Sequence, residues 1–294
     1  MRKRLAFLLL ALVALLAAAC GRETPETSGG DEQADLSETS IPACVTNQGT
    51  IAPAAADGGA LELLTPGKLV VGSDTAFPPF ESIENGKAVG FDVDLITEIG
   101  KRLNLQVDVQ TAVFDTIFTS LAAKKFDAVI SAVTIKEERK RTVDFTDPYF
   151  TSDLSLSVRA GDAGKFKGVD DLEGETIGVQ AGTTSEDCAK SALKDKGKVA
   201  DIRAYDTIPD AFTDLAAGRV AAVLIDLPTA KQITEERSGI NVVQVIKTAE
   251  DYGIAVGKHA PNLRVAINDA LKKIKDDGAY AKLFVKWFKT QPPE

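Results

Sequence analysis

The residues best suited to bind a small charged molecule lie in one run, Ser131–Arg139. An apolar stretch, Phe126 to Val133, predicts a buried strand that carries Ser131 as a small polar side chain near its end. Beyond it come free backbone N–H groups, the Thr134 hydroxyl and then Arg139, whose guanidinium can bind both oxygens of a carboxylate at once. The run therefore predicts a carboxylate site. The alternative is that Arg139 pairs with a neighbouring glutamate on a solvated helix face.

Length, composition and charge set broad limits on the rest of the molecule. The 294 residues are enough for one large or two ordinary domains. Hydrophobic residues make up 44% and charged residues 26% of the chain, as in soluble globular proteins. A formal net charge of −9 argues against a nucleic-acid partner, which would require clustered Lys and Arg.

The N-terminus reads as a targeting segment. Basic residues at Arg2 to Arg4 precede an apolar run, Leu5 to Ala19, that is short for a membrane span. Small residues directly before Cys20 resemble a bacterial lipobox, although the usual Leu position holds Ala17. We therefore expect residues 1–19 to be a lipoprotein signal peptide and Cys20 to carry lipid. The protein would then be exported and anchored on the outer face of the cell membrane or in the periplasm. An ordinary secretory signal is the alternative.

The segment after Cys20 is predicted to be a flexible tether, residues 20–64. Glu23 to Ser40 is rich in acidic, hydroxyl and Gly residues and has hardly any apolar side chain, so it cannot bury a core. Two further cysteines, Cys44 and Cys188, would lie in an oxidising compartment, and a disulfide between them is plausible. Two free thiols are the alternative.

From Gly67 onward the pattern is one of alternating strands and helices. Leu69–Val71 and Leu105–Val109 are expected to be strands, and helices are expected to be capped by Asp92 and Asp115. Alternation of this kind predicts an α/β fold around a largely parallel sheet.

The pattern then recurs, which predicts two similar lobes. Residues 121–130 are echoed by residues 215–224, and Gly67–Gly72 is echoed by Gly174–Val179. Ligands bind beyond the carboxyl ends of parallel strands. In the first lobe those ends carry Asp74 and residues 131–134, and in the second they carry residues 180–184 and Asp226. Two such edges facing each other would form a cleft.

The chain is expected to close on the first lobe. Tyr252–Val256 reads as a strand, and an amphipathic helix with apolar residues from Leu263 to Ile274 follows it. Leu283–Phe288 is apolar and amphipathic, and is interpreted as a last helix docked on the first lobe.

Several motifs in this order resemble the polar amino-acid solute-binding proteins of bacterial ABC importers, extracellular solute-binding protein family 3. They are Gly72–Glu81, Gly90–Leu95, Phe114-Asp115, Thr134–Arg139 and Asp144–Tyr149. The likeness runs from about Gly67 to Trp287. It implies the two-lobed α/β fold of type II periplasmic binding proteins, with two crossovers forming a hinge. The first lobe would comprise residues 65–152 and 250–294, and the second lobe residues 153–249.

The resemblance also implies how a ligand is held. Arg139 would bind the α-carboxylate with backbone N–H groups of Thr134 and Thr184. Asp226 would bind the α-ammonium, assisted by the Thr134 hydroxyl and a carbonyl near Ala132. The implied ligand-binding residues are Asp74, Phe77, Phe114, Ser131, Ala132, Thr134, Arg139, Gln180, Thr183, Thr184 and Asp226.

Phe77 and Phe114 would enclose the ligand side chain, with Asp74 at its distal end, while Phe80 is expected in the core. Each assignment has a structural alternative. Asp226 could be the N-cap before Pro228, the two phenylalanines could be ordinary core, and the Gly-Thr-Thr-Ser run from Gly182 could only cap a helix.

Asp74 carries the argument on ligand choice. If Arg139 and Asp226 balance the ligand zwitterion, Asp74 is an extra buried negative charge that disfavours acidic ligands. A basic amino acid (Arg, Lys, ornithine or His) satisfies it, and so does the amide of glutamine. The glutamine-binding members of the family have Lys and His where this chain has Gln180 and Ile225. We therefore expect a basic ligand, with glutamine as the alternative.

The expected role is that of a binding protein. Ligand would favour closure of the lobes, and the membrane subunits of the importer, driven by a cytoplasmic ATPase, would recognise that form. A monomer is expected, with no cofactor or metal. A lyase or dehydratase on the same fold is the alternative from another class, but the single histidine, His259, lies in a turn away from the predicted cleft.

Overall fold

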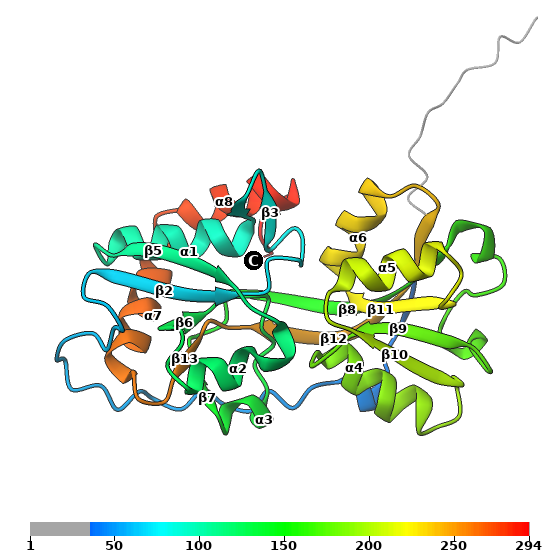
Figure 1. Ribbon diagram of the computed structural model, residues 1–294, viewed down its shortest axis with the longest axis horizontal. Helices are drawn as coiled ribbons and strands as arrows, with labels where there is room; N and C mark the ends of the chain where they lie inside the picture. The colour runs from blue at the N-terminus through cyan, green and yellow to red at the C-terminus, as the bar shows by residue number, and fades with distance from the viewer. Residues whose placement is uncertain (1–35, 294) are drawn as a thin grey trace, which may run out of the picture. The chain divides into compact units, whose positions relative to one another are not determined.

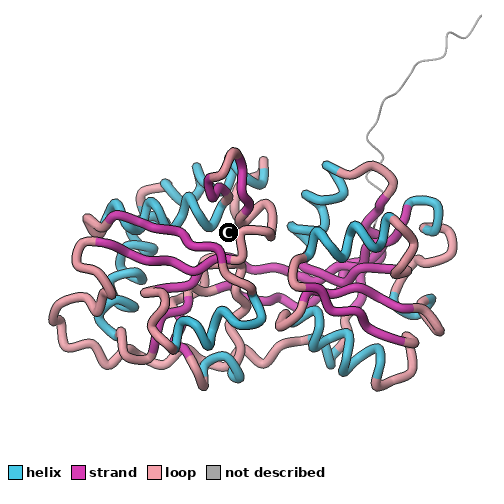
Figure 2. Tube along the Cα trace, in the orientation of Figure 1, coloured by secondary structure: helices cyan, strands magenta, loops and turns pink. Residues whose placement is uncertain are grey.

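The computed structural model describes residues 36–293. The predicted signal peptide, Cys20 and the tether up to residue 35 lie outside the described residues. Within them the chain folds around two mixed sheets with helices on both faces (Figures 1 and 2). Across residues 36–293, every helix is too short or too polar to span a membrane.

The first sheet forms the core of lobe 1, with strand order β5-β2-β6-β13-β7. Its strands are β2 (Lys68–Ser73), β5 (Gln106–Thr111), β6 (Ala128–Val129), β7 (Val143–Phe145) and β13 (Ala255–Gly257). A small hairpin, β3 (Ser82–Glu84) and β4 (Lys87–Val89), lies beside it. The helices of this lobe are α1 (Phe91–Arg102), α2 (Phe114–Ala122), α3 (Glu137–Lys140), α7 (Pro261–Asp276) and α8 (Ala279–Phe288).

Alternation along β2 explains how helices cover both faces of this sheet. Leu69 and Val71 are fully buried among residues of α1, α7 and α8, whereas Val70 packs with Ile117 and Leu121 of α2. The C-terminal helix α8 docks on α1, where the Trp287 indole donates to Asp94 at 2.7 Å. The predicted final helix on the first lobe is therefore confirmed, and Phe80 is buried in the aromatic core as expected.

The second sheet forms the core of lobe 2, with strand order β1-β12-β8-β11-β9-β10. Its strands are β1 (Ser37–Thr39), β8 (Phe150–Arg159), β9 (Thr176–Gln180), β10 (Asp201–Tyr205), β11 (Ala222–Asp226) and β12 (Ile240–Tyr252). The α-helices here are α4 (Thr184–Cys188), α5 (Ile208–Ala216) and α6 (Leu227–Glu236). Shorter turns are η1 (Pro42–Cys44), η2 (Ala160–Asp162), η3 (Val169–Asp171) and the π-helical η4 (Ala189–Lys194).

The sequence echoes correspond to equivalent strand pairs. β2 runs parallel to β6 with Val71 opposite Ala128, and β9 runs parallel to β11 with Ile177 opposite Ala222. The sheets are less parallel than predicted, because β13 lies antiparallel to both β6 and β7, and β8 antiparallel to both β11 and β12. These antiparallel pairs involve the strands by which the chain leaves lobe 1 and returns to it.

Three local predictions are corrected. The predicted strand Phe126–Val133 pairs only at Ala128–Val129, although the whole stretch is buried. Asp92 does not cap α1, which begins after Gly90; its buried carboxylate instead accepts from the backbone N–H of Ala132 at 2.8 Å. Asp115 is the second residue of α2 rather than its cap, which is Val113. In both helices a preceding residue already adopts the non-helical cap conformation.

The chain passes between the lobes along a long antiparallel pair. Residues 150–152 of β8 pair with residues 250–252 of β12, and a β-bulge interrupts β12 between Ile246 and Glu250. The carboxylate of Asp153 accepts from the backbone N–H groups of Thr248 and Ala249, at 2.9 and 3.0 Å, which fixes the bulge.

The N-terminal segment, defined here as residues 36–64, packs along both lobes, so the predicted tether is too long. β1 pairs with β12, and the Gln48 side chain bonds the backbone of Ala249 and Asp251, both at 2.7 Å. Farther along, the Leu64 N–H donates to Asp127 of lobe 1 at 2.6 Å. The prediction from composition was wrong because backbone pairing and one buried cysteine hold this segment in place. Neither of these requires a run of apolar residues.

Candidate functional site

One pocket between the lobes collects the predicted ligand-binding residues, all except Asp74. Its lining comprises Phe77, Phe114, Ser131, Ala132, Thr134, Arg139, Gln180, Thr183, Thr184 and Asp226. The polar members come from the carboxyl ends of β6, β9 and β11 and from the turns and short helices that follow them, as the parallel-strand rule requires. Each lobe therefore contributes one wall.

Arg139 is buried in the pocket wall rather than placed on a solvated helix face. Its guanidinium donates to the carbonyl oxygens of Thr134 at 2.7 Å and Gly182 at 3.0 Å, and lies over the rings of Phe114 and Phe118. The neighbouring glutamates pair with Lys136 and Lys140 instead. Burial lowers the pKa of Arg139 to about 10, so the side chain remains a cation at neutral pH. Two carbonyl dipoles do not neutralise it, and it can still attract an anion.

Asp226 provides the opposite charge on the other wall. It is the N-cap residue of α6, but its side chain makes no cap hydrogen bond; the carboxylate accepts from the Tyr252 hydroxyl instead. Burial raises the pKa of Asp226 to about 6, while the Tyr252 hydrogen bond and Arg139 act to lower it. The carboxyl is thus ionised at neutral pH in a site that favours pairing with a cation.

Asp74 does not line the pocket itself, but its carboxylate is hydrogen-bonded to Gln180, which does. The Gln180 amide donates to the Asp74 carboxylate at 2.8 Å, across the two lobes, and to the Asp206 carbonyl at 3.1 Å. The oxygen of that amide is buried and has no hydrogen-bond partner among the described residues. Burial raises the pKa of Asp74 to about 6. Among the described residues, the Asp74 carboxylate therefore has one side-chain donor, and the Gln180 amide oxygen beside it has none.

Two buried acidic residues, Glu81 and Asp92, lie next to Ser131 and Ala132 of the pocket lining. Neither was assigned a role from the sequence. Ser131 donates to Glu81 at 2.6 Å and accepts from the Asp74 backbone N–H at 3.0 Å. Burial raises the pKa of Asp92 to about 7, and burial together with the Asp92 charge raises the pKa of Glu81 well above its usual value. Glu81 belongs to the Pro-Pro-Phe-Glu run, but nothing in the sequence distinguishes a buried glutamate there from a solvated one.

The threonines of the second wall have defined partners. Thr183 is the N-cap of α4, where its hydroxyl accepts from the Glu186 N–H at 3.2 Å and donates to the Gln180 carbonyl at 2.7 Å. The Thr134 and Thr184 hydroxyls both donate to Glu250, at 2.8 and 2.7 Å. A donating hydroxyl keeps its lone pairs, so Thr134 can still accept from an ammonium group.

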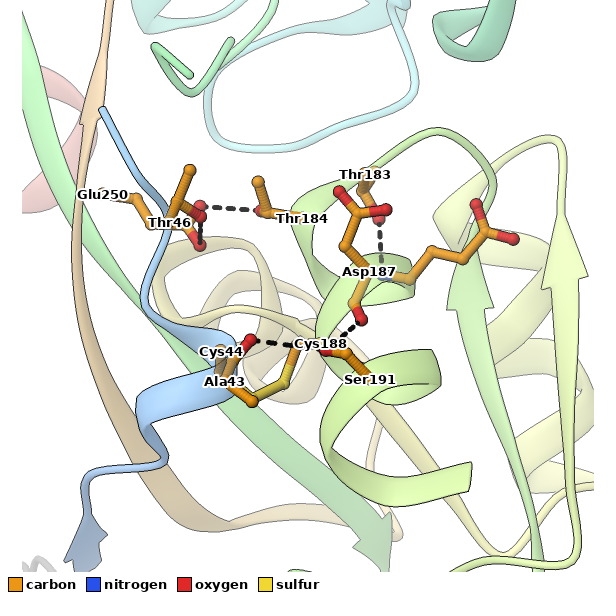
Figure 3. Close-up of a disulfide and its surroundings, with 10 residues drawn as sticks. Ala43, Cys44, Thr46, Thr183, Thr184, Asp187, Cys188, Ser191 and Glu250 are labelled. Atoms are coloured by element: carbon orange, nitrogen blue, oxygen red, sulfur yellow. Dashed lines mark hydrogen bonds between the residues drawn. A yellow bond between two sulfur atoms is a disulfide. The ribbon is translucent and has the colours of Figure 1, made fainter. Parts of the chain in front are cut away.

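Cys44 and Cys188 are joined by a disulfide (Figure 3). Cys44 ends η1 in the N-terminal segment and Cys188 ends α4, the helix that begins with Thr184. The bridge thus attaches the N-terminal segment to the helix that forms part of the second wall.

Glu250 is the functional candidate that the sequence interpretation missed. It is fully buried, and burial and Asp226 raise its pKa to about 7. In the sequence it stands in the polar run Lys247–Asp251, and nothing local distinguishes a buried glutamate there from a solvated one. Only the three-dimensional structure places threonines from both lobes around it.

Comparisons with known proteins show the family and support the fold. The family model described as bacterial extracellular solute-binding proteins, family 3, matches residues 69–290. The L-cystine-binding protein TcyJ of Escherichia coli is 33% identical over 224 residues, covering 76% of this chain and 83% of that protein. The lysine/arginine/ornithine-binding periplasmic protein of Escherichia coli is 32% identical over 227 residues, covering 74% and 86%. Among solved structures, an ancestral arginine-binding protein bound to arginine is 42% identical, with a TM-score of 0.72 over 76% of this chain and 98% of that one.

Proposed function

Because the chain belongs to family 3 of the bacterial extracellular solute-binding proteins, the polar amino-acid-binding subunits of ABC importers, we propose that it captures a basic amino acid between its lobes. The ligand would be arginine, lysine, ornithine or histidine. The cystine-binding protein TcyJ and the lysine/arginine/ornithine-binding protein are 33% and 32% identical to this chain, so identity to these two does not select the ligand.

One observation carries the proposal: Arg139 and Asp226 line the same pocket from opposite lobes. A free amino acid is a zwitterion, and it needs one fixed cation and one fixed anion a short distance apart. Both groups are buried, so each is stabilised when an opposite charge enters. Backbone N–H groups of Thr134 and Thr184 would complete the carboxylate site.

The distal end of the pocket favours a cationic side chain. There the Asp74 carboxylate, bonded to Gln180 behind the lining, and the Gln180 amide oxygen, which has no partner in the part of the chain that the structure describes, are both acceptors. A guanidinium or ammonium group donates to both and neutralises Asp74, whereas an acidic ligand would bury two like charges together. Phe77 and Phe114 would enclose the aliphatic part of such a ligand.

Glutamine remains the second candidate, because its amide also donates to Asp74. Its oxygen would need a donor, however, and the nearby Ile225 is buried and apolar. An enzymatic role has less support. His259 packs against Gly257 of β13 and is not part of the pocket lining, so no imidazole is placed to move a proton there.

The proposed cycle is hinge closure. Residues 65–152 and 250–294 would move as one lobe and residues 153–249 as the other, bending where β8 and β12 cross and β12 is bulged. The closed form would be recognised by the permease subunits and their cytoplasmic ATPase. We further propose that the protein acts as an exported monomer held at the membrane by lipid on Cys20.

A thermal-shift panel tests the proposal. The chain from Gly21 onward is purified, stripped of bound ligand by unfolding and refolding with the disulfide intact, and mixed with each amino acid, ornithine, citrulline and cystine. A ligand that binds only the folded form raises the melting temperature. A large shift with a basic amino acid supports the proposal, a shift with glutamine or cystine alone corrects its specificity, and no shift with any of them contradicts it.

A further inference from the structure

Glu250 connects three segments of the chain through one buried carboxylate. Its Oε2 atom accepts from the hydroxyls of Thr134, at 2.8 Å, and Thr184, at 2.7 Å. Its Oε1 atom accepts from the hydroxyl of Thr46, in the N-terminal segment, at 3.4 Å. Figure 3 shows Thr46 and Thr184 both pointing toward this carboxylate. Burying a carboxylate is costly, so such a cluster requires partners that satisfy it.

The hydrogen bond from Thr184 crosses between the lobes. Glu250 is fixed to lobe 1, because the next residues of β12 bond to it: Ile135 donates to the Asp251 carbonyl at 2.8 Å, and Thr134 forms a β-bridge with Tyr252. Thr184 is the first residue of α4 in lobe 2. Separating the lobes would therefore break the Thr184 bond and keep the Thr134 bond.

The same carboxylate organises the proposed carboxylate site without lining the pocket. Thr134 accepts from Arg139 through its carbonyl, and Arg139 also donates to Gly182, just before Thr183 and Thr184. Glu250 thus holds the two residues whose N–H groups would face the ligand carboxylate, and it contributes negative charge that favours the Arg139 cation.

We propose that Glu250 is a positioning residue: by binding Thr134 and Thr184 together it stabilises the closed, ligand-holding form. This inference rests on the proposed function. It assigns to Glu250 a role in affinity rather than in ligand choice, because its partners surround the ligand carboxylate that all amino acids share.

The test is a set of variants measured with L-arginine, or with the panel amino acid that gives the largest shift. Glu250→Ala should weaken binding about 10- to 100-fold, as expected for losing charge-assisted hydrogen bonds, mainly through faster dissociation. Glu250→Gln keeps an acceptor oxygen and should recover much of that loss. Thr184→Val should weaken binding in the natural chain and have no further effect beside Glu250→Ala. Asp251→Asn is the matched control and should bind normally, because among the described residues the carboxylate of this neighbouring acidic position bonds Thr151 and no residue of the pocket.

A merely structural role predicts different results. In that case Thr184→Val would lower the melting temperature of the ligand-free protein, and its effect would persist beside Glu250→Ala. Natural affinity in both Glu250→Ala and Thr184→Val would overturn the inference while leaving the proposed function intact. A natural chain that binds no amino acid in the panel would overturn both.

Discussion

At the scale of single residues, the balance of charge in the pocket decides which ligand fits. Arg139 and Asp226 offset each other, while within residues 36–293 the Asp74 carboxylate has only the Gln180 amide as a hydrogen-bond partner. The raised pKa of Asp74, about 6, reflects a carboxylate whose burial is poorly compensated. A cationic ligand would provide that compensation and would in turn lower the pKa of Asp74.

Asp74→Asn should therefore change ligand preference. Removing one partner of a buried ion pair costs several kcal/mol, so arginine affinity should fall at least about 100-fold, while glutamine should bind as well as before or better. Calorimetric titration with both amino acids gives the ratio directly. Asp144→Asn, which removes an ion pair with Lys258 on lobe 1, is an acidic control outside the pocket and the hinge. An unchanged ratio of arginine to glutamine affinity would show that Asp74 does not contact the ligand side chain.

The same residue predicts a pH effect on binding. Since cationic ligands need ionised Asp74 and its pKa in the free protein is about 6, arginine affinity should fall as the pH drops through 6. Glutamine affinity should lack this component, because Asp226 and Glu250 affect both ligands alike. The ratio of the two dissociation constants, followed from pH 7.5 to pH 5, isolates the contribution of Asp74. A ratio that is independent of pH would contradict the assignment.

Arg139→Lys tests the carboxylate site. A lysine keeps the charge but loses the fork that bonds Thr134 and Gly182 and grips two carboxylate oxygens, so binding should weaken at least about 100-fold for every amino acid. Circular dichroism checks that the fold is kept. Binding within a few-fold of the natural chain would mean that the carboxylate lies elsewhere.

The pocket residues that could be predicted from the sequence are those whose role follows from their residue type and their position at the end of a strand. A strand end followed by Thr134 and Arg139, and Asp226 at the end of another strand, are local patterns that family motifs reinforce. Glu250 was missed for a physical reason. Its burial depends on residues far apart in the chain, from Thr46 to Thr184, and no local pattern encodes that meeting.

At the scale of elements, the N-terminal segment is an additional connection between the lobes. β1 and the disulfide attach it to lobe 2, and Gln48 bonds β12 at the bulge where the lobes meet. The segment then continues to Leu64, whose backbone N–H donates to Asp127 of lobe 1. The repeat in the sequence predicted the paired β2–β6 and β9–β11 units, but a segment outside the repeat gives no such signal.

Removing the disulfide should destabilise the fold. It closes a loop across a sequence separation of 144, for which the loss of unfolded-state entropy predicts a stabilisation of about 2–5 kcal/mol. The double variant Cys44→Ala/Cys188→Ala should therefore unfold at lower urea concentration than the oxidised natural chain. Reductant should lower the midpoint of the natural chain and leave that of the variant unchanged. Equal midpoints for the natural chain with and without reductant would contradict a stabilising role.

At the scale of the whole molecule, buried carboxyls make stability depend on pH. Burial raises the pKa of Asp74 and Asp226 to about 6, and that of Asp92 and Glu250 to about 7. In the unfolded chain such groups titrate near their usual value of about 4. Between pH 5 and 7.5 the folded protein therefore holds protons that the unfolded chain has lost, and its stability falls as the pH rises.

The ligand-free protein should accordingly melt several degrees higher at pH 5 than at pH 7.5. His259 acts in the opposite direction, because its lowered pKa favours the folded state as the pH rises, but it is one group against several carboxyls. Carboxyls with lowered pKa, such as Asp214, titrate below this window. Asp92→Asn, an amide with the shape of the neutral acid, should flatten the dependence measured by calorimetry at fixed ionic strength. A melting temperature that rises from pH 5 to 7.5 would mean that these carboxyls are ionised in the folded protein, and that their hydrogen bonds outweigh their burial.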